Sequence, residues 1–325
     1  EGEAVNKLIS ELSESNVSSS PIAVSAENDI LDKNTSDKIF GGDLVLTQSK
    51  TETFVNCKFA YACKYHLSLD DGQKAEFSYS NIGTFIHHIL EKFLFAVYVE
   101  NGGRSIGDID IEDVVSNIID NYVNEIIPVG EARSARLVHL IERLKRSALT
   151  IIADILTELN DSSFKPEFFE LRIGTHNVPS VKIKLKNGQT VSVSGIVDRV
   201  DVFRKDGKAY IRVIDYKTGS KTFSVSDIEE GLNMQMLLYV FSLTRGDKKQ
   251  LSVLFGGEPV AAAISYCSFA SSKVKATRLG DTESNKSSDI VRSGLILDDD
   301  DVIDAVSHSG NDKYLMRSAR KNSFV

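Results

Sequence analysis

The chain has 325 residues, of which 42% are hydrophobic, and a formal net charge of −8 at pH 7. This length and apolar content are enough for one large domain or two modest ones. The negative charge excludes a protein that binds DNA through a positive overall charge, so any DNA-binding surface has to be local.

There is no charged-then-apolar leader and no uninterrupted apolar run of about 18 residues, so we expect neither secretion nor a membrane span. The chain starts at Glu1 rather than at a methionine, and we interpret it as a piece of a longer protein. Its three cysteines, an odd number, favour a reducing cytoplasm over a disulfide framework.

Residues 1–41 are rich in Ser, Asn, Asp and Glu, and we expect a polar, poorly ordered arm or linker there. Residues 42–325 are predicted to form one domain, with a helical portion at about 50–160 and a sheet at about 165–270. A short strand at 43–47 opens this domain.

The first predicted helix runs from a capping box made by Ser49 and Glu52 to about Tyr65. Cys57 and Cys63 fall inside it without the spacing of a structural zinc site. We therefore expect both cysteines to be small, buried hydrophobic residues.

Three more helices are predicted at 83–97, 109–122 and 131–159. His87, in the first, is on its own more typical of a surface or core residue than of a metal ligand. The third begins with a basic run that is either a solvated face or a contact for a phosphate backbone: Arg133, Arg136, Arg143, Lys145 and Arg146.

The pattern then changes to the period of two that strands show, at 167–173, 180–185, 190–203 and 259–269. Asn187-Gly188 is predicted to be a hairpin turn. The remaining predicted elements are a helix at 226–243 with Ser226 as its N-cap, a polar loop at 271–290 and a short helix at 298–306.

A second hairpin turn is predicted at Asp206-Gly207, and its position determines which residues of the two flanking strands lie opposite each other. If Lys205 faces Lys208, then Asp198 lies opposite Asp215, with Cβ atoms about 4.5–5.5 Å apart. Two carboxylates that close repel each other unless a cation lies between them, and Mg²⁺ is held by such groups. We therefore predict a metal site.

Neighbouring side chains follow from the same register. Lys217 shares a face with Asp215, where an ammonium suits reactions on phosphate. Asp201 falls opposite Arg212 on the other face and is predicted to form an ion pair. Glu170 either reaches the metal region or faces solvent. The face that carries Asp198 otherwise consists of predicted core residues, namely Ile196, Val200, Val202, Ile211 and Val213.

Gln235 and Tyr239 are four residues apart and share a helix face with several apolar side chains. Core packing explains the tyrosine, whereas a glutamine in that stripe favours a functional role.

These motifs, taken in order, resemble the RecB-like branch of the PD-(D/E)XK nuclease superfamily, in particular the nuclease domains of AddAB-type helicase–nucleases. The resemblance covers about residues 42–310 and rests on His87, Glu170, Gly195-Ile-Val-Asp198, Asp215-Tyr-Lys217-Thr-Gly and Gln235-Met-Leu-Leu-Tyr239, with the segments Leu46–Phe59 and Gly83–Glu91.

The resemblance implies an α/β fold of the restriction-endonuclease type, a central mixed β-sheet flanked by helices. Asp198 and Asp215 would be the metal-binding carboxylates and Lys217 the motif lysine. His87 and the backbone carbonyl of Tyr216 would be further metal ligands. The implied catalytic residues are Asp198, Asp215, Lys217, Gln235 and Tyr239, and the implied cofactor is Mg²⁺ or Mn²⁺.

The implied function is a metal-dependent DNA exonuclease that acts on a single strand during double-strand-break repair, in a heterodimer with an AddA-type motor subunit. No Walker A sequence is found, so this piece cannot power a helicase. The alternatives are an inactive nuclease fold that serves as a DNA-binding scaffold, and a free-standing RecB-like nuclease.

Some members of the family hold an iron–sulfur cluster, whose first ligand would be Cys57. A cluster needs four thiolates, and this chain has three cysteines, of which Cys267 falls in a predicted strand. The sequence therefore argues against a complete cluster within this chain.

Overall fold

The computed structural model describes residues 34–35, 38, 41–69, 79–100, 109–126, 135–219, 223–269 and 290–316. The chain divides into two compact units, Glu1–Gly42 and Asp43–Val325, and the fold below is that of the second. Nearly all of the arm predicted at 1–41 and of the loop predicted at 271–290 lies outside the described residues.

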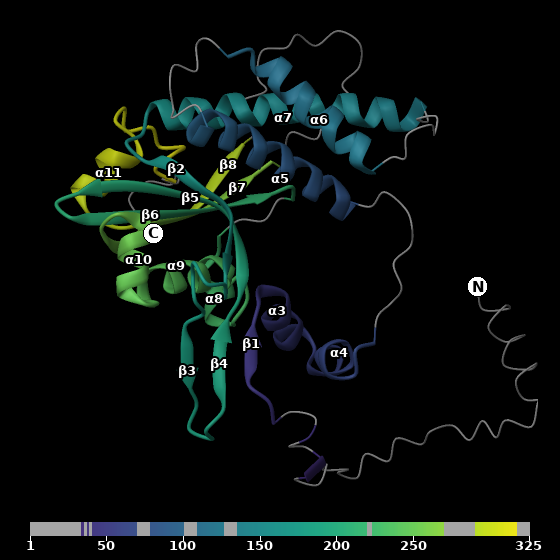
Figure 1. Cartoon of the computed structure of the whole chain (residues 1–325), viewed down its shortest axis with the longest axis vertical. Helices are drawn as coiled ribbons and strands as arrows, with labels where there is room; N and C mark the ends of the chain where they lie inside the picture. The colour runs from purple at the N-terminus through teal and green to yellow at the C-terminus, as the bar shows by residue number, and fades with distance from the viewer. Residues whose placement is uncertain are drawn as a thin grey trace, which may run out of the picture. The chain divides into compact units, whose positions relative to one another are not determined.

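A five-stranded mixed sheet forms the centre of the unit, in the order β2-β5-β6-β7-β8 (Figure 1). Only the β6–β7 pair is parallel. The strands are β2 (Lys165–Ile173), β5 (Gly195–Lys205), β6 (Lys208–Lys217), β7 (Glu258–Ser268) and β8 (Val291–Ile296).

Helices cover both faces of this sheet (Figure 1). One face packs against α5 (Tyr79–Phe95), its continuation η2 (Ala96–Glu100), α6 (Ile111–Ile126) and α7 (Ala135–Asn160). The other carries α8 (Val225–Glu229), α9 (Gln235–Arg245) and α10 (Lys248–Phe255), and α11 (Asp300–Val306) packs on a third, smaller cluster with Phe164. The predicted α/β fold, a mixed sheet flanked by helices, is confirmed.

Within the described residues, one helix, Ile82–Glu100, is long and apolar enough to cross a membrane, with a mean hydropathy of 1.3. Its apolar stripe is buried against α6 and α7 in the core, through Phe85, Ile86, Ile89, Leu90, Phe93, Leu94 and Val97. Such burial is typical of a core helix, whose periodic apolar face packs on the sheet.

A second, three-stranded sheet has the order β1-β4-β3, with β1 (Leu44–Leu46), β4 (Thr190–Val193) and β3 (Lys182–Lys184). The single strand predicted at 190–203 is therefore wrong, because the chain leaves β4 at Ser194 and enters β5 in the central sheet. Ile196, predicted to be core, is 37% exposed near this change of sheet.

The helix predicted from Ser49 to Tyr65 is interrupted. It consists of α3 (Gln48–Asn56), α4 (Lys58–Tyr61) and η1 (Ala62–His66), because Cys57 is extended with φ −158° and ψ 107°. The N-cap is Thr47, whose hydroxyl accepts from the Lys50 amide, rather than Ser49. The predicted burial of both cysteines is wrong, since Cys57 is exposed and Cys63 half-buried.

The helix predicted at 226–243 is also two helices. Gly231 and Asn233, with φ values of 80° and 53°, separate α8 from α9, because left-handed residues end a helix. The cap of α8 is Ser224. Helix α10 and strand β8 had no prediction.

A buried network of ion pairs ties the sheet to α7 and β8. Asp201 accepts from Arg212 at 2.7 Å, as predicted, and also from Arg199 at 3.1 Å. Glu158 on α7 then bridges Arg212 at 3.0 Å and Arg292 on β8 at 2.8 Å. Burial raises the pKa of Glu158, but the two arginines outweigh it and lower that pKa to about 2.

We expect Glu158→Gln to lower the free energy of unfolding at pH 7 by about 3–5 kcal/mol, because it leaves buried guanidinium charge uncompensated. The folded-state pKa lies below the usual 4.5, so this stabilisation is complete above pH 4.5 and is lost as the pH falls towards 2. Urea unfolding between pH 7 and pH 3 measures the difference. Glu142→Gln, on an exposed part of the same helix, is the control. Equal costs for the two variants would contradict the prediction.

Candidate metal centre

The β5–β6 hairpin has the register predicted from its turn. Asp206 and Gly207 both have positive φ, 51° and 74°, as a type I′ turn requires. Pairing runs from Lys205–Lys208 to Arg199–Ile214, so Asp198 and Asp215 are the next residues opposite each other.

A third carboxylate belongs to the same row. On β2 the pairs Phe169–Arg199 and Leu171–Val197 flank Glu170, which places Glu170 opposite Asp198. Glu170 has a φ of 47°, a strained left-handed conformation for a residue within a strand. The sheet thus lines up three acids on adjacent strands, with Asp198 in the middle.

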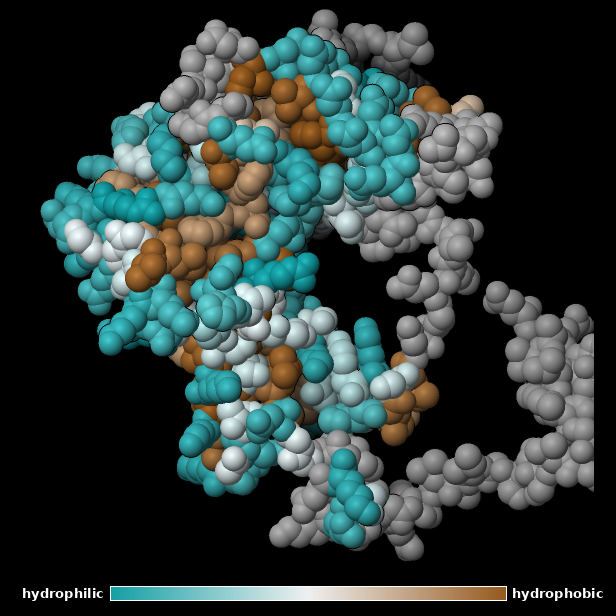
Figure 2. Space-filling view, viewed as in Figure 1, coloured by the Kyte–Doolittle hydropathy of each residue, from teal (hydrophilic) through white to brown (hydrophobic). Residues whose placement is uncertain are grey.

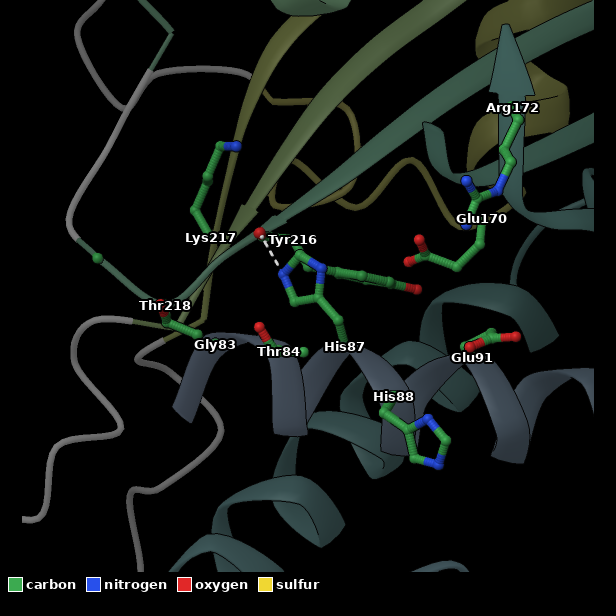
Figure 3. A pocket seen from close by; sticks show the side chains of 11 residues that line it. Gly83, Thr84, His87, His88, Glu91, Glu170, Arg172, Tyr216, Lys217 and Thr218 are labelled. Carbon is green, nitrogen blue, oxygen red and sulfur yellow. Dashed lines mark hydrogen bonds between the residues drawn. The ribbon is translucent and has the colours of Figure 1, made fainter. Parts of the chain in front are cut away.

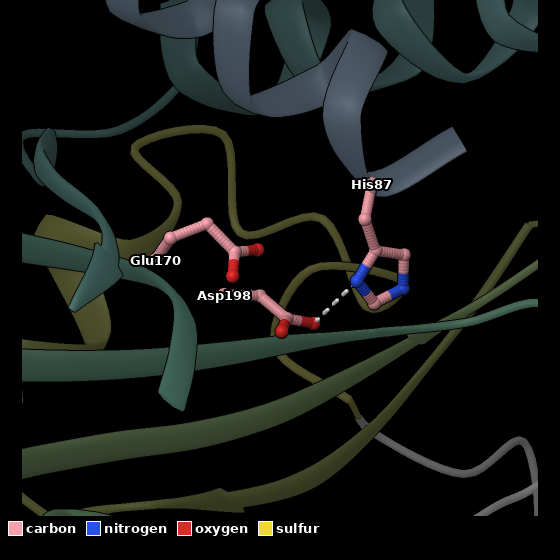
Figure 4. Close-up of side chains that lie close together, drawn as sticks. All are labelled: His87, Glu170 and Asp198. Atoms are coloured by element: carbon pink, nitrogen blue, oxygen red, sulfur yellow. Dashed lines mark ion pairs between the residues drawn. The ribbon is translucent and has the colours of Figure 1, made fainter. Parts of the chain in front are cut away.

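Helix α5 adds a histidine from the opposite side. His87 Nδ1 lies 3.5 Å from Asp198 Oδ2, and His87 Nε2 lies 2.9 Å from the Tyr216 carbonyl oxygen. The ligand atoms of His87, Glu170 and Asp198 all lie within 4.8 Å of one another (Figure 4). The Tyr216 amide donates to Asp198 Oδ2 at 2.7 Å, so one carboxylate links the backbone and the imidazole.

Burial and charge set the protonation of this group. Burial, and then the charge of Asp215, raise the pKa of Asp198 well above its usual value. Burial, and then Glu91, raise the pKa of Glu170. Burial lowers the pKa of His87, which leaves a neutral imidazole able to act as a ligand.

This donor set fits a divalent metal ion. Carboxylate and carbonyl oxygens with one imidazole suit Mg²⁺ and Mn²⁺. A cation here would favour the charged form of Asp198, whose pKa is raised by burial and then by the charge of Asp215.

A chain of polar contacts continues from the carboxylates to α9. Lys217 Nζ lies 2.5 Å from Asp215 Oδ2 and donates to Gln235 Oε1 at 3.1 Å. Gln235 Nε2 in turn donates to the Tyr239 hydroxyl at 3.2 Å. The structure therefore brings together all five residues that the resemblance implies for catalysis.

The close approach of the Tyr239 ring explains why residue 195, shortly before Asp198 on β5, is a glycine. A Cβ at Gly195 would lie 2.4 Å from Cε1 of Tyr239, closer than any side chain can approach. The ring of Tyr239 therefore packs directly on the β5 backbone, and this packing fixes the partner of Gln235.

The group opens into a pocket of about 750 Å³ between α5, β2 and the end of β6. Figure 3 shows His87, Tyr216 and Glu170 around it, with Lys217 on the opposite wall from Arg172. Arg172 was not predicted from the sequence. Its signal was its position two residues after Glu170, which puts both on one face of β2.

The remaining candidate residues do not join this site. Lys145 pairs with Glu112 at 3.1 Å, and the exposed Arg143 and Arg146 do not line the pocket. Arg133 and the side chain of Arg136 lie outside the described residues.

The cysteines do not fit an iron–sulfur cluster within this chain, because it has three cysteines for the four thiolates required. Cys57 is exposed, whereas Cys267 is buried in β7, where burial raises the pKa of its thiol to about 12 and disfavours a thiolate.

Residues 45–309 match the family model of the PD-(D/E)XK nuclease superfamily. The chain belongs to this superfamily, and the row of acids with its lysine is the candidate site. The chain is similar to bacterial proteins whose names describe one subunit of an ATP-dependent helicase/deoxyribonuclease.

Among these relatives, that of Clostridioides difficile is 32% identical over 86% of this chain and 24% of its own length. That of Clostridium novyi is 33% identical over 65% and 19%. That of Caldanaerobacter subterraneus is 33% identical over 62% and 18%. The chain spans about a quarter or less of the length of these curated relatives.

We expect Gly195→Ala to cost about 1–3 kcal/mol of stability, because the new methyl group overlaps the Tyr239 ring. In a Tyr239→Ala background the ring is absent, so the same glycine substitution should cost less than about 0.5 kcal/mol. Urea unfolding of the four proteins gives the coupling energy. An equal cost in both backgrounds would show that overlap with the Tyr239 ring is not the cause of the lost stability.

Proposed function

We propose that this chain is the nuclease module of an AddAB-type helicase–nuclease, a metal-dependent exonuclease that hydrolyses phosphodiester bonds in DNA. The observation that carries this proposal is the convergence of Asp198, Asp215, Lys217 and Gln235 beside the imidazole of His87. A scaffold without activity would need none of these contacts, and their retention disfavours that alternative.

In this proposal Mg²⁺ or Mn²⁺ is held by His87, Asp198, Asp215 and the Tyr216 carbonyl, with Glu170 as a further ligand. When bound, the ion supplies a water of lowered pKa and neutralises charge on the scissile phosphate.

Lys217 has the role of orienting the attacking water and donating hydrogen bonds to the phosphate as its charge develops. Asp215 and Gln235 hold its ammonium from two sides, at 2.5 and 3.1 Å, so its direction is fixed before substrate binds. Tyr239 fixes the amide of Gln235. In-line attack leaves a 5′-phosphate and a 3′-hydroxyl.

The proposed setting is the cytoplasm, in a heterodimer with an AddA-type motor subunit that delivers a single strand during double-strand-break processing. The support is the name of the relatives, each a subunit of a helicase/deoxyribonuclease, together with the lack of a Walker A sequence in this chain. A free-standing nuclease is the remaining alternative.

We expect Asp215→Asn and Lys217→Ala each to reduce Mg²⁺-dependent digestion of single-stranded DNA by at least about 10²-fold, because each removes transition-state stabilisation. Digestion of a labelled oligonucleotide measures the rates, and Lys208→Ala at the exposed hairpin turn is the control. Unchanged activity in the site variants would refute the site. No activity of the unaltered chain, even with its motor subunit, would favour the scaffold.

Arg172 is proposed to position the strand. It is exposed, it lines the pocket, and its guanidinium forms no hydrogen bond or ion pair with the described part of the chain. It is thus available for a substrate phosphate, which a guanidinium binds through two parallel hydrogen bonds.

Replacing Arg172 by alanine removes one phosphate contact. We expect the slope of log K against log salt concentration for oligonucleotide binding to become shallower by about 0.7. Fluorescence anisotropy at several salt concentrations in Ca²⁺ measures the slope, and the exposed Arg245→Ala on α9 is the matched control. An unchanged slope for Arg172→Ala would exclude the contact.

A further inference from the structure

The segment from Gln48 to His66 forms α3, α4 and η1, and none of its residues is buried. Phe59 is 79% exposed and Phe54 is 46% exposed. Figure 2 shows hydrophobic residues at the surface over α4. Aromatic rings this exposed contribute little to a core, so core packing does not explain why this segment carries them.

The rings of Phe54, Tyr61, Tyr65 and His66 form one cluster beside Phe59 in the sequence. The centroid of Tyr61 lies 5.3 Å from that of Phe54, 5.2 Å from that of Tyr65 and 5.4 Å from that of the His66 ring. These distances hold the side chains as a preformed platform.

Three lysines lie over rings of this platform. Lys50 and Lys64 each lie 5.5 Å from the centroid of Tyr65, and Lys58 lies 5.7 Å from that of Phe54. From Lys50 to His66 the sequence carries three lysines against one acid, Glu52, in a chain whose net charge is −8. We call these residues, Lys50, Phe54, Lys58, Phe59, Tyr61, Lys64 and Tyr65, the aromatic–lysine surface.

A series of packing contacts links the segment that carries this surface to the proposed nuclease site. Val55 Cγ2 lies 3.3 Å from the Cβ position at Gly231, in the loop that leads to Gln235. In that loop the Asn233 carbonyl accepts from the Tyr266 hydroxyl at 3.5 Å, and the ring of Tyr266 lies 5.6 Å from Lys217 Nζ.

We propose that the aromatic–lysine surface binds the single strand of DNA that extends from the nuclease site, and this rests on the proposed function. Bases stack on the exposed rings, because every base has a π-face, and the lysines face the phosphates. A duplex hides its base faces, so the surface selects single strands. An apolar protein partner is a poorer match for a surface with three lysines and one acid.

The test uses the chain in EDTA, so that binding is measured without cleavage. We expect Phe59→Ala to weaken binding of a fluorescent oligo(dT) strand about tenfold, as loss of one stacked base does, and to leave binding of a blunt duplex unchanged. Because Phe59 is 79% exposed, its loss does not threaten folding. Val253→Ala, an apolar residue 83% exposed on α10, is the control.

Each result decides the proposal. Unaltered oligo(dT) binding by Phe59→Ala, or no oligo(dT) binding by the unaltered chain, overturns it, and so does equal weakening by Val253→Ala. Loss of association with the motor subunit at unchanged oligo(dT) affinity overturns it in favour of a protein interface. If oligo(dT) binding depends on Phe59 but the chain never cleaves DNA, the binding surface is supported and only the proposed nuclease function is refuted.

Discussion

Repulsion among three carboxylates is the constraint on which this structure depends. Glu170, Asp198 and Asp215 occupy adjacent strands in register, and burial with like charge raises the pKa of the central acid. Three neighbouring features offset this repulsion. Lys217 compensates Asp215, the Tyr216 amide donates to Asp198, and His87 completes a set of donors suited to a divalent ion.

Tyr216 links this site to the rest of the domain. Its amide donates to Asp198, its carbonyl contacts His87, and its hydroxyl accepts from Arg199 at 2.9 Å. Arg199 in turn belongs to the buried ion network that reaches α7 and β8. The network therefore fixes the backbone of Tyr216, whose carbonyl is a proposed metal ligand. The buried charges thus position the site as well as stabilise the fold.

The parts of the site that the sequence predicted are those that local rules determine. A positive-φ turn fixes the register of a hairpin, which is why Asp198 and Asp215 could be placed opposite each other. A polar glutamine in an apolar stripe marked Gln235 as functional, and the resemblance gave it a role. The resemblance alone supplied His87, since contacts between distant elements leave no local signal.

Failures occurred where tertiary contacts overrode the local pattern. The run 190–203 alternates like one strand, yet it feeds two sheets, and Gly195 at the junction accommodates the Tyr239 ring, which comes from α9. Positive φ at Asn233 divided a helix that its apolar stripe predicted to be continuous. Arg172 shares a face of β2 with Glu170, but the pocket that both residues line becomes visible only in the structure.

The most direct test of the central claim is anomalous diffraction from crystals of the chain grown with Mn²⁺. We expect one strong anomalous peak within about 2.2 Å of His87, Asp198, Asp215 and the Tyr216 carbonyl. A peak away from this row, or a fully ordered site with no peak at saturating Mn²⁺, would contradict it.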